Sequence, residues 1–161
     1  MNKILERKTL KDKLEELRIK GKKIAFTNGC FDILHVGHVR YLREAKETAD
    51  VLVMALNSDS SVRLLKGEER PLVPEKERAE ILAALECIDF VTIFEEITPL
   101  ELINYLKPDL LIKGGDWPEE KVVGREEIKE WGGRVAIIPE VEGKSTTNIV
   151  EKIKILHCSN T

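Results

Sequence analysis

The sequence has few cysteines and no long hydrophobic segment. Its three cysteines form no C-x-x-C pair and give an odd count, which is typical of free thiols in a reducing compartment. No apolar run approaches the roughly 20 residues that span a bilayer, and the N-terminus lacks the apolar core of a signal peptide. We therefore expect a cytoplasmic protein with no membrane partner.

The chain also lacks a surplus of basic residues. Its 26 Lys and Arg and 29 Asp and Glu give a formal net charge of -3, and the two signs are mixed along the sequence. Nucleic-acid-binding proteins usually carry a basic surplus, so the composition argues against a nucleic-acid partner. A G-x-G-x-x-G fingerprint is absent after the first predicted strand, which argues against a nicotinamide-dependent dehydrogenase.

Short apolar runs alternate with amphipathic segments, without internal repeats. Continuous apolar runs predict strands at 23–26, 51–56, 90–94, 110–113 and 134–139. Helices are predicted between them, at 5–19, 39–45, 75–85, 98–106, 124–131 and from 145 onward. About five strands alternating with about as many helices predict an α/β fold, a Rossmann-like three-layer sandwich with a mostly parallel, about five-stranded sheet.

Residues 27–38 connect the first predicted strand to the helix that follows. Because this turn lies at the carboxyl edge of a parallel sheet, its backbone N–H groups and the helix N-terminus can receive an anion. His35 and His38 are three residues apart, so both rings fall on one face of the helix, and Gly37 leaves space for a ligand near the backbone. The turn therefore predicts a phosphate site.

Two other interpretations of the histidines remain open at this point. A metal pair is disfavoured because the third histidine, His157, is distant in sequence and no Cys or carboxylate stands at ligand spacing, so no metal ligand is expected. Ordinary capping or core histidines are the second alternative. Cys30, which precedes them, is expected to pack as a small side chain rather than to act as a nucleophile.

The motif Gly29-Cys30-Phe31-Asp32, followed by His35-Val36-Gly37-His38, resembles the signature of the cytidylyltransferase-like superfamily of nucleotidyltransferases. In that superfamily an H-x-G-H turn holds the phosphates of a nucleoside triphosphate. The resemblance covers about residues 22–156. Further blocks are similar to the heptose 1-phosphate adenylyltransferase domain of bacterial ADP-heptose synthesis, at 57–59, 65–71, 113–116 and 143–150. We therefore expect residues 1–20 to form an N-terminal amphipathic helix packed on a nucleotidyltransferase domain at 21–161.

The resemblance implies a reaction and its partners. An oxygen of D-glycero-β-D-manno-heptose 1-phosphate would attack the α-phosphorus of ATP, giving ADP-heptose and pyrophosphate for lipopolysaccharide core synthesis. Mg²⁺ would enter with ATP as substrate, and no tightly held prosthetic group is implied. A homodimer is expected, and a separate heptose kinase, because 161 residues hold one domain.

Two alternatives to this function are kept. Within the same chemistry, the chain would be a cytidylyltransferase acting on glycerol 3-phosphate or another polyol phosphate. In another class, it would be a non-catalytic nucleotide-binding regulatory module, which binds ATP without releasing pyrophosphate.

The resemblance also implies roles for individual residues. The catalytic candidates are His38, His35 and Lys66. Contacts to the nucleotide and to pyrophosphate are expected from Phe31, Asp32, Gly37, Arg70, Lys113, Gly115, Asp116, Ser145, Thr146 and Thr147. Residues expected on the sugar-phosphate side are Asn57, Asp59 and Arg78. Related sequences carry an arginine soon after the last hydroxyl run, whereas residues 148–151 contain none, which leaves Lys144 or Lys152 as an alternative cation.

Overall fold

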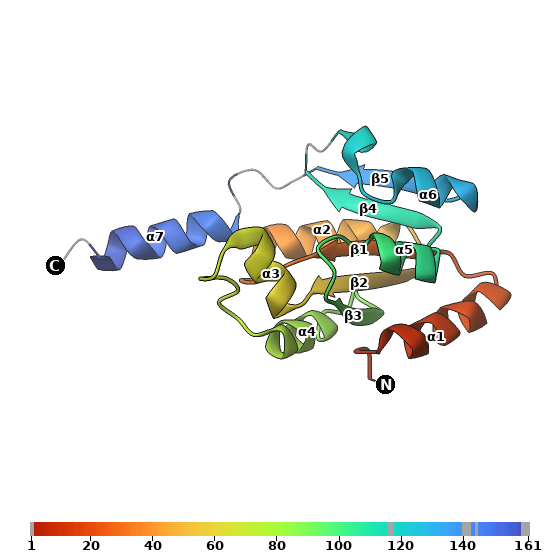
Figure 1. Ribbon diagram of the computed structural model, residues 1–161, viewed down its shortest axis with the longest axis horizontal. Helices are drawn as coiled ribbons and strands as arrows, with labels where there is room; N and C mark the ends of the chain where they lie inside the picture. The colour runs from red at the N-terminus through yellow and green to blue at the C-terminus, as the bar shows by residue number, and fades with distance from the viewer. Residues whose placement is uncertain (1, 116–117, 140–142, 144, 159–161) are drawn as a thin grey trace.

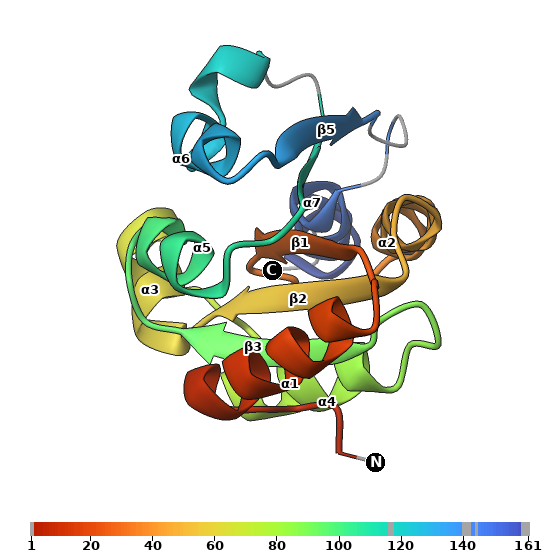
Figure 2. The ribbon, with the colours of Figure 1, turned by 90° about the vertical axis from the view of Figure 1, so that its right-hand side faces the viewer.

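The computed structural model describes residues 2–115, 118–139, 143 and 145–158. These residues form one five-stranded sheet in the order β3-β2-β1-β4-β5, and every pairing is parallel (Figures 1 and 2). The strands are β1 (Ile24–Gly29), β2 (Val51–Asn57), β3 (Phe90–Phe94), β4 (Leu110–Gly114) and β5 (Arg134–Ile138). The prediction of an α/β Rossmann-like fold with a parallel sheet is therefore confirmed.

Seven α-helices lie in the described part of the chain. They are α1 (Arg7–Ile19), α2 (Val36–Glu47), α3 (Asp59–Lys66), α4 (Glu75–Ala83), α5 (Leu100–Leu106), α6 (Arg125–Glu130) and α7 (Thr146–Cys158). A short 3₁₀ turn spans Glu119–Lys121. Six of these helices correspond to predicted ones, and α3 was not foreseen.

The sheet separates two hydrophobic cores. On one face, Leu10 and Leu14 of α1 pack with apolar side chains of α5 and α6. On the other, Leu42 of α2 and Leu82 of α4 pack against the strands. β2 is buried along its whole length, as expected for a strand covered on both faces. The helices thus form the two outer layers of the sandwich, as Figure 2 shows.

Helix α3 begins directly after β2, in a stretch for which no helix was predicted. Its N-cap is Ser58, whose hydroxyl accepts a hydrogen bond from the backbone N–H of Ser61 at 3.2 Å. It ends at Gly67, which adopts a positive φ of 99°. Lys66, predicted to lie in a loop, is therefore the last residue of a helix.

Helix α7 extends away from the sheet at the end where β1 and β2 finish (Figure 1). Several of its apolar side chains are exposed, including Ile153, Ile155 and Leu156. None of the helices in the described ranges is long and apolar enough to cross a membrane.

Candidate active site

A cleft of about 590 Å³ lies at the carboxyl edge of the sheet. From β1 the sheet extends in one direction through β2 and β3, and in the other direction through β4 and β5. The strand order therefore reverses between β1 and β4. Ligands of open α/β sheets bind at such a crevice. Eight predicted site residues line the cleft, namely Phe31, His38, Asn57, Lys66, Arg70, Lys113, Thr146 and Thr147.

The turn after β1 has an unusual backbone. Phe31 has a φ of 44°, in the left-handed region that non-glycine residues rarely adopt. Its ring lies 4.7 Å from the ring of His38, centroid to centroid. A Cβ atom on Gly29 would come within 2.7 Å of the Phe31 ring, so a side chain at position 29 would displace the phenyl group. Gly29 therefore permits the packing that supports His38.

His38 is held as a neutral hydrogen-bond donor. Its Nδ1 accepts a hydrogen bond from the backbone N–H of His35 at 3.4 Å, which assigns the ring proton to Nε2. Burial, together with the neighbouring His35, lowers the pKa of His38 to about 4. Because His38 lines the cleft, its Nε2–H group is available to a ligand there at neutral pH.

His35 supports this arrangement from the N-cap of α2. Its ring stacks on that of His38, with centroids 3.8 Å apart and an angle of 25° between the planes. His35 is not among the residues that line the cleft, and Gly37 is buried in the first turn of α2. The structure thus brings His38 to the cleft and keeps His35 behind it.

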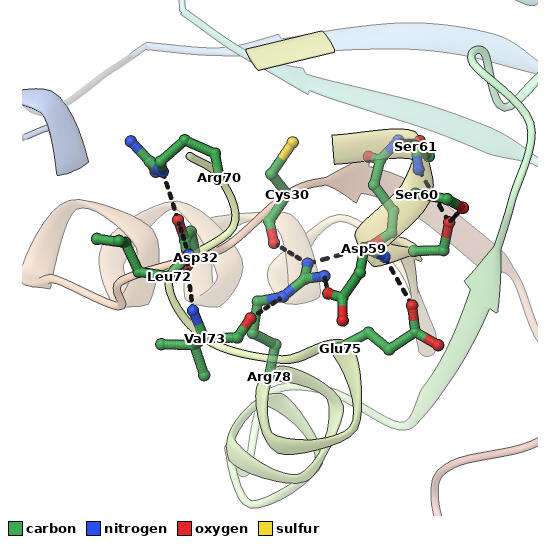
Figure 3. Close-up of polar contacts among 12 residues, drawn as sticks. Cys30, Asp32, Asp59, Ser60, Ser61, Arg70, Leu72, Val73, Glu75 and Arg78 are labelled. Atoms are coloured by element: carbon green, nitrogen blue, oxygen red, sulfur yellow. Dashed lines mark hydrogen bonds and ion pairs between the residues drawn. The ribbon is translucent and has the colours of Figure 1, made fainter. Parts of the chain in front are cut away.

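Asp32 anchors the loop that carries Arg70 (Figure 3). Its carboxylate accepts hydrogen bonds from Arg70 Nε at 2.6 Å and from the backbone N–H groups of Leu72 and Val73. Burial alone would raise the pKa of Asp32, but these donors outweigh it and keep the pKa below its usual value. The side chain of Asp32 therefore orients Arg70 at the cleft.

Two lysines reach the cleft from different elements. Lys66 ends α3 and is exposed. Lys113 lies next to the last residue of β4, and its Nζ donates to Asn28 Oδ1 at 2.6 Å, which connects β4 to β1 at the crevice. Burial lowers the pKa of Lys113 to about 8, and only the nearby Cys30 opposes this shift. An anion bound in the cleft would restore the charged form of Lys113.

Cys30 lines the same cleft. Burial raises the pKa of its thiol, although Lys66 and Arg78 act in the opposite direction. A thiol with a raised pKa is protonated at neutral pH and is not an activated nucleophile. The prediction that Cys30 does not act as a nucleophile agrees with this environment.

The N-terminus of α7 closes the cleft on one side. Ser145 caps this helix, because its hydroxyl accepts the backbone N–H of Asn148 at 3.0 Å. Thr146 donates to the carbonyl oxygen of Ile33 at 3.3 Å, and both Thr146 and Thr147 line the cleft. Of the three hydroxyl residues predicted for this site, Ser145 therefore caps the helix, and Thr146 and Thr147 line the cleft.

Arg78 is not placed for direct contact with a substrate. Its side chain has no exposed surface, and its guanidinium is paired with Asp59 at 2.7 Å. Neither residue lines the cleft. Arg78 was expected on the sugar-phosphate side, and the structure leaves its guanidinium no exposed surface for direct contact with a ligand in the cleft.

Other expected residues lie at the margin of this site. Gly115 is buried directly after β4, with a positive φ of 94°, and does not line the cleft. Asp116 and Lys144 lie outside the described residues, and Lys152 is exposed on α7. Sequence reasoning missed the segment 97–99 and Val123 as contributors to the cleft. Residues 97–99 follow β3, so the rule that the strand ends of a parallel sheet share one edge could have found them.

The chemistry of the cleft suits anions. Its polar side chains are an imidazole donor, two ammonium groups, a guanidinium, amides and hydroxyls. In the described part of the chain, no group of three or more His, Cys, Asp or Glu could hold a metal ion.

A cleft lined by cationic, amide and hydroxyl side chains, at the point of a parallel α/β sheet where the strand order reverses, is typical of nucleotide-binding proteins. Residues 26–156 match the family described as "Cytidylyltransferase-like". The chain belongs to this family of nucleotidyltransferases.

Curated relatives are similar over most of the chain. The chain is 58% identical over 152 residues to the "Bifunctional protein HldE" of Syntrophotalea carbinolica, and 61% identical over 140 residues to that of Geobacter metallireducens. These alignments cover 94% and 87% of the chain but 31% and 29% of the relatives. The chain thus spans less than a third of the length of these relatives.

Solved structures share the fold. The lipopolysaccharide core biosynthesis protein from Thermoplasma volcanium is 28% identical with a TM-score of 0.64, covering 77% of the chain and 100% of that protein. A pantoate-beta-alanine ligase from Francisella tularensis has a TM-score of 0.62 at 17% identity, covering 94% of the chain and 77% of the ligase. The second likeness concerns the fold alone.

Proposed function

We propose that the protein transfers AMP from ATP to D-glycero-β-D-manno-heptose 1-phosphate, giving ADP-heptose and pyrophosphate. The observation that carries the transfer chemistry is the cleft, in which the neutral donor His38 faces the same space as Lys66, Arg70 and Lys113. The choice of acceptor is supported by the resemblance of four sequence blocks to heptose 1-phosphate adenylyltransferase domains, together with the high identity to HldE proteins.

The attacking group is already an anion, so the reaction needs no protein nucleophile and gains little from a strong base. The barrier lies in bringing two anionic reactants into line and in the charge that builds on the phosphoryl oxygens. Lys66, Arg70 and Lys113 would offset this charge from three sides. The left-handed turn at Phe31 would present backbone N–H groups to the triphosphate.

His38 would donate its Nε2–H to an oxygen of the α-phosphate, or to the bridging oxygen, as negative charge develops there. A donor fixed in advance at such a position is typically worth on the order of a hundred- to a thousand-fold in rate. The departing pyrophosphate would be received by Thr146, Thr147 and the positive end of α7.

Mg²⁺ bound to ATP would neutralise part of the charge on the β- and γ-phosphates. The proposal includes a cytoplasmic location, where nucleoside triphosphate is available. It also includes a homodimer, testable by light scattering, and a heptose kinase outside these 161 residues that supplies the sugar 1-phosphate.

An acceptor screen tests the proposed function. The protein is incubated with ATP or CTP and with heptose 1-phosphate of either anomer or glycerol 3-phosphate, and released pyrophosphate is measured. We expect turnover with ATP and the β-anomer. Turnover only with CTP and glycerol 3-phosphate would instead establish a polyol-phosphate cytidylyltransferase. Binding of ATP without pyrophosphate release from any pair would establish a regulatory nucleotide-binding module.

A further inference from the structure

Arg78 lies in the first turns of α4, directly behind the wall of the cleft. It is a large charged side chain, yet its relative exposure is 1%. Burial of an arginine is costly unless each donor is paired. Figure 3 shows its guanidinium at the centre of a set of polar contacts, with Cys30, Asp59 and Val73 around it.

The guanidinium joins segments that are far apart in sequence. It donates to the carbonyl oxygen of Cys30 at 2.5 Å, to that of Asn57 at 3.0 Å and to that of Val73 at 2.8 Å. It also donates to the carboxylate of Asp59 at 2.7 Å. These partners belong to the turn after β1, the end of β2, the loop before α4 and the start of α3. One side chain therefore fixes four segments at or next to the cleft relative to one another.

The contact with Cys30 sets the direction of one peptide group. In a trans peptide the C=O and N–H bonds point in opposite directions. The carbonyl of Cys30 points toward the buried guanidinium, so the N–H of Phe31 points away from Arg78, and Phe31 itself lines the cleft. This N–H is one of the backbone donors at which the triphosphate is proposed to bind.

Phe31, the second residue of this peptide group, has an unfavourable backbone conformation. Phe31 has a φ of 44°, which a non-glycine residue keeps only where its surroundings enforce it. The hydrogen bond from Arg78 is one such restraint. Without it, the Cys30–Phe31 peptide could rotate toward an ordinary conformation and turn its N–H group away from the cleft.

A second contact extends the effect to Arg70. The N–H of Val73 donates to Asp32 at 2.9 Å, while its carbonyl accepts from Arg78. Val73 is thus held at both ends, by the residue that also binds Arg70 and by the buried guanidinium. The position of Arg70 in the cleft therefore depends on Arg78 through Val73 and Asp32.

We propose that Arg78 is a positioning residue that orients the Cys30–Phe31 peptide, so that the N–H of Phe31 faces the triphosphate, and that holds the loop of Arg70 against the same cleft. It acts without touching a substrate. This inference rests on the proposed function only in assuming that ATP binds at the turn after β1. It does not depend on the identity of the acceptor.

The test uses Arg78→Lys, with Arg63→Lys as the matched control. Lysine keeps the charge but has a single ammonium group, which cannot reach four acceptors in different directions. Arg63 is an exposed residue of α3 outside the site. Binding of α,β-methylene ATP is measured by calorimetry, and the amide resonance of Phe31 is followed by ¹⁵N NMR as the analogue is added. Melting curves identify the temperatures at which each protein is folded.

We expect the Phe31 amide to shift strongly when wild-type protein and Arg63→Lys bind the analogue. In folded Arg78→Lys we expect about a tenfold or greater loss of affinity and a much smaller Phe31 shift. Normal affinity and a normal Phe31 shift in that variant would assign Arg78 a purely structural role and overturn the inference.

The wild-type spectrum tests the role proposed for Arg78 even if the Arg78→Lys variant does not fold. An analogue that binds tightly without moving the Phe31 amide would overturn the inference, while the proposed function stands. Failure of wild-type protein to bind the analogue at all would instead reject both the proposed function and the role of Arg78.

Discussion

The rings of His35 and His38 stack with their centroids 3.8 Å apart, and the backbone N–H of His35 donates to Nδ1 of His38. The two histidines of the motif therefore have different tasks. His35 fixes the orientation and the tautomer of its neighbour, and His38 presents the remaining N–H to the cleft. A neutral donor at this position stabilises developing negative charge without changing its own protonation state.

The first prediction concerns replacement of His38. His38→Ala removes the donor, so we expect kcat to fall on the order of a hundred- to a thousand-fold with a native melting curve. The side-chain amide of glutamine can donate from near the position of Nε2, so His38→Gln should lose less activity. Steady-state pyrophosphate release measures both variants. Equal losses in the two would mean that the Nε2–H group is not what His38 contributes.

The second prediction concerns pH. The pKa of His38 is about 4 in the folded protein, below the value of about 6.5 for an exposed histidine. Between these values the unfolded chain binds a proton that the folded protein does not, so His38 makes stability fall as the pH decreases from about 6.5 to about 4. Allowing for partial solvent screening, the loss should be on the order of 2 kcal/mol.

Urea unfolding at pH 7 and at pH 4.5 checks this prediction, with His38→Gln as the reference. Both proteins share the titration of the carboxylates, so the difference between them isolates His38. The wild-type protein should lose more stability than the variant as the pH falls. An equal loss of stability in the two proteins would contradict a neutral, buried His38.

The sequence allowed the sheet and the centre of the cleft to be predicted because both depend on local patterns. Continuous apolar runs marked the five strands, and the motif spacing placed His38 at the carboxyl edge. The end of β2 was harder to interpret, since the polar run that opens α3 looks like a loop until Ser58 is seen to cap it. Helix α3 has only eight residues, fewer than the window of about 11–18 residues over which an apolar period is usually recognised.

Contacts between distant residues could not be predicted in the same way. Asp32 and Arg70 are separated by 38 positions, and their pairing depends on how the loop before α4 folds over the turn. Arg78 looks like one more charge on an amphipathic helix, and only the fold shows that its guanidinium is buried. An arginine is usually exposed, so its burial follows from the four acceptors that converge on it.

The third prediction concerns Gly29. Gly29→Ala would bring a Cβ atom within 2.7 Å of the Phe31 ring, which must then move and release its contact with His38. We expect kcat to fall at least tenfold, with a loss of stability of about 1–3 kcal/mol. Gly114→Ala at the end of β4 is the comparison, because its Cβ would meet the Tyr41 ring at 3.2 Å, a milder overlap. A larger kinetic defect in Gly114→Ala would count against this account of Gly29.

The fourth prediction concerns proton uptake by Lys113. Its pKa of about 8 means that about half of the molecules carry a neutral Lys113 at pH 8. A triphosphate in the cleft favours the charged form, so ATP binding at pH 8 should take up about half a proton. Calorimetric titrations in buffers of different ionisation enthalpy measure this uptake directly. It should vanish in Lys113→Met and persist in Lys76→Met, which removes an exposed lysine of α4. Binding enthalpies that do not depend on the buffer would show that Lys113 is already charged before ATP enters, or that the phosphates lie elsewhere.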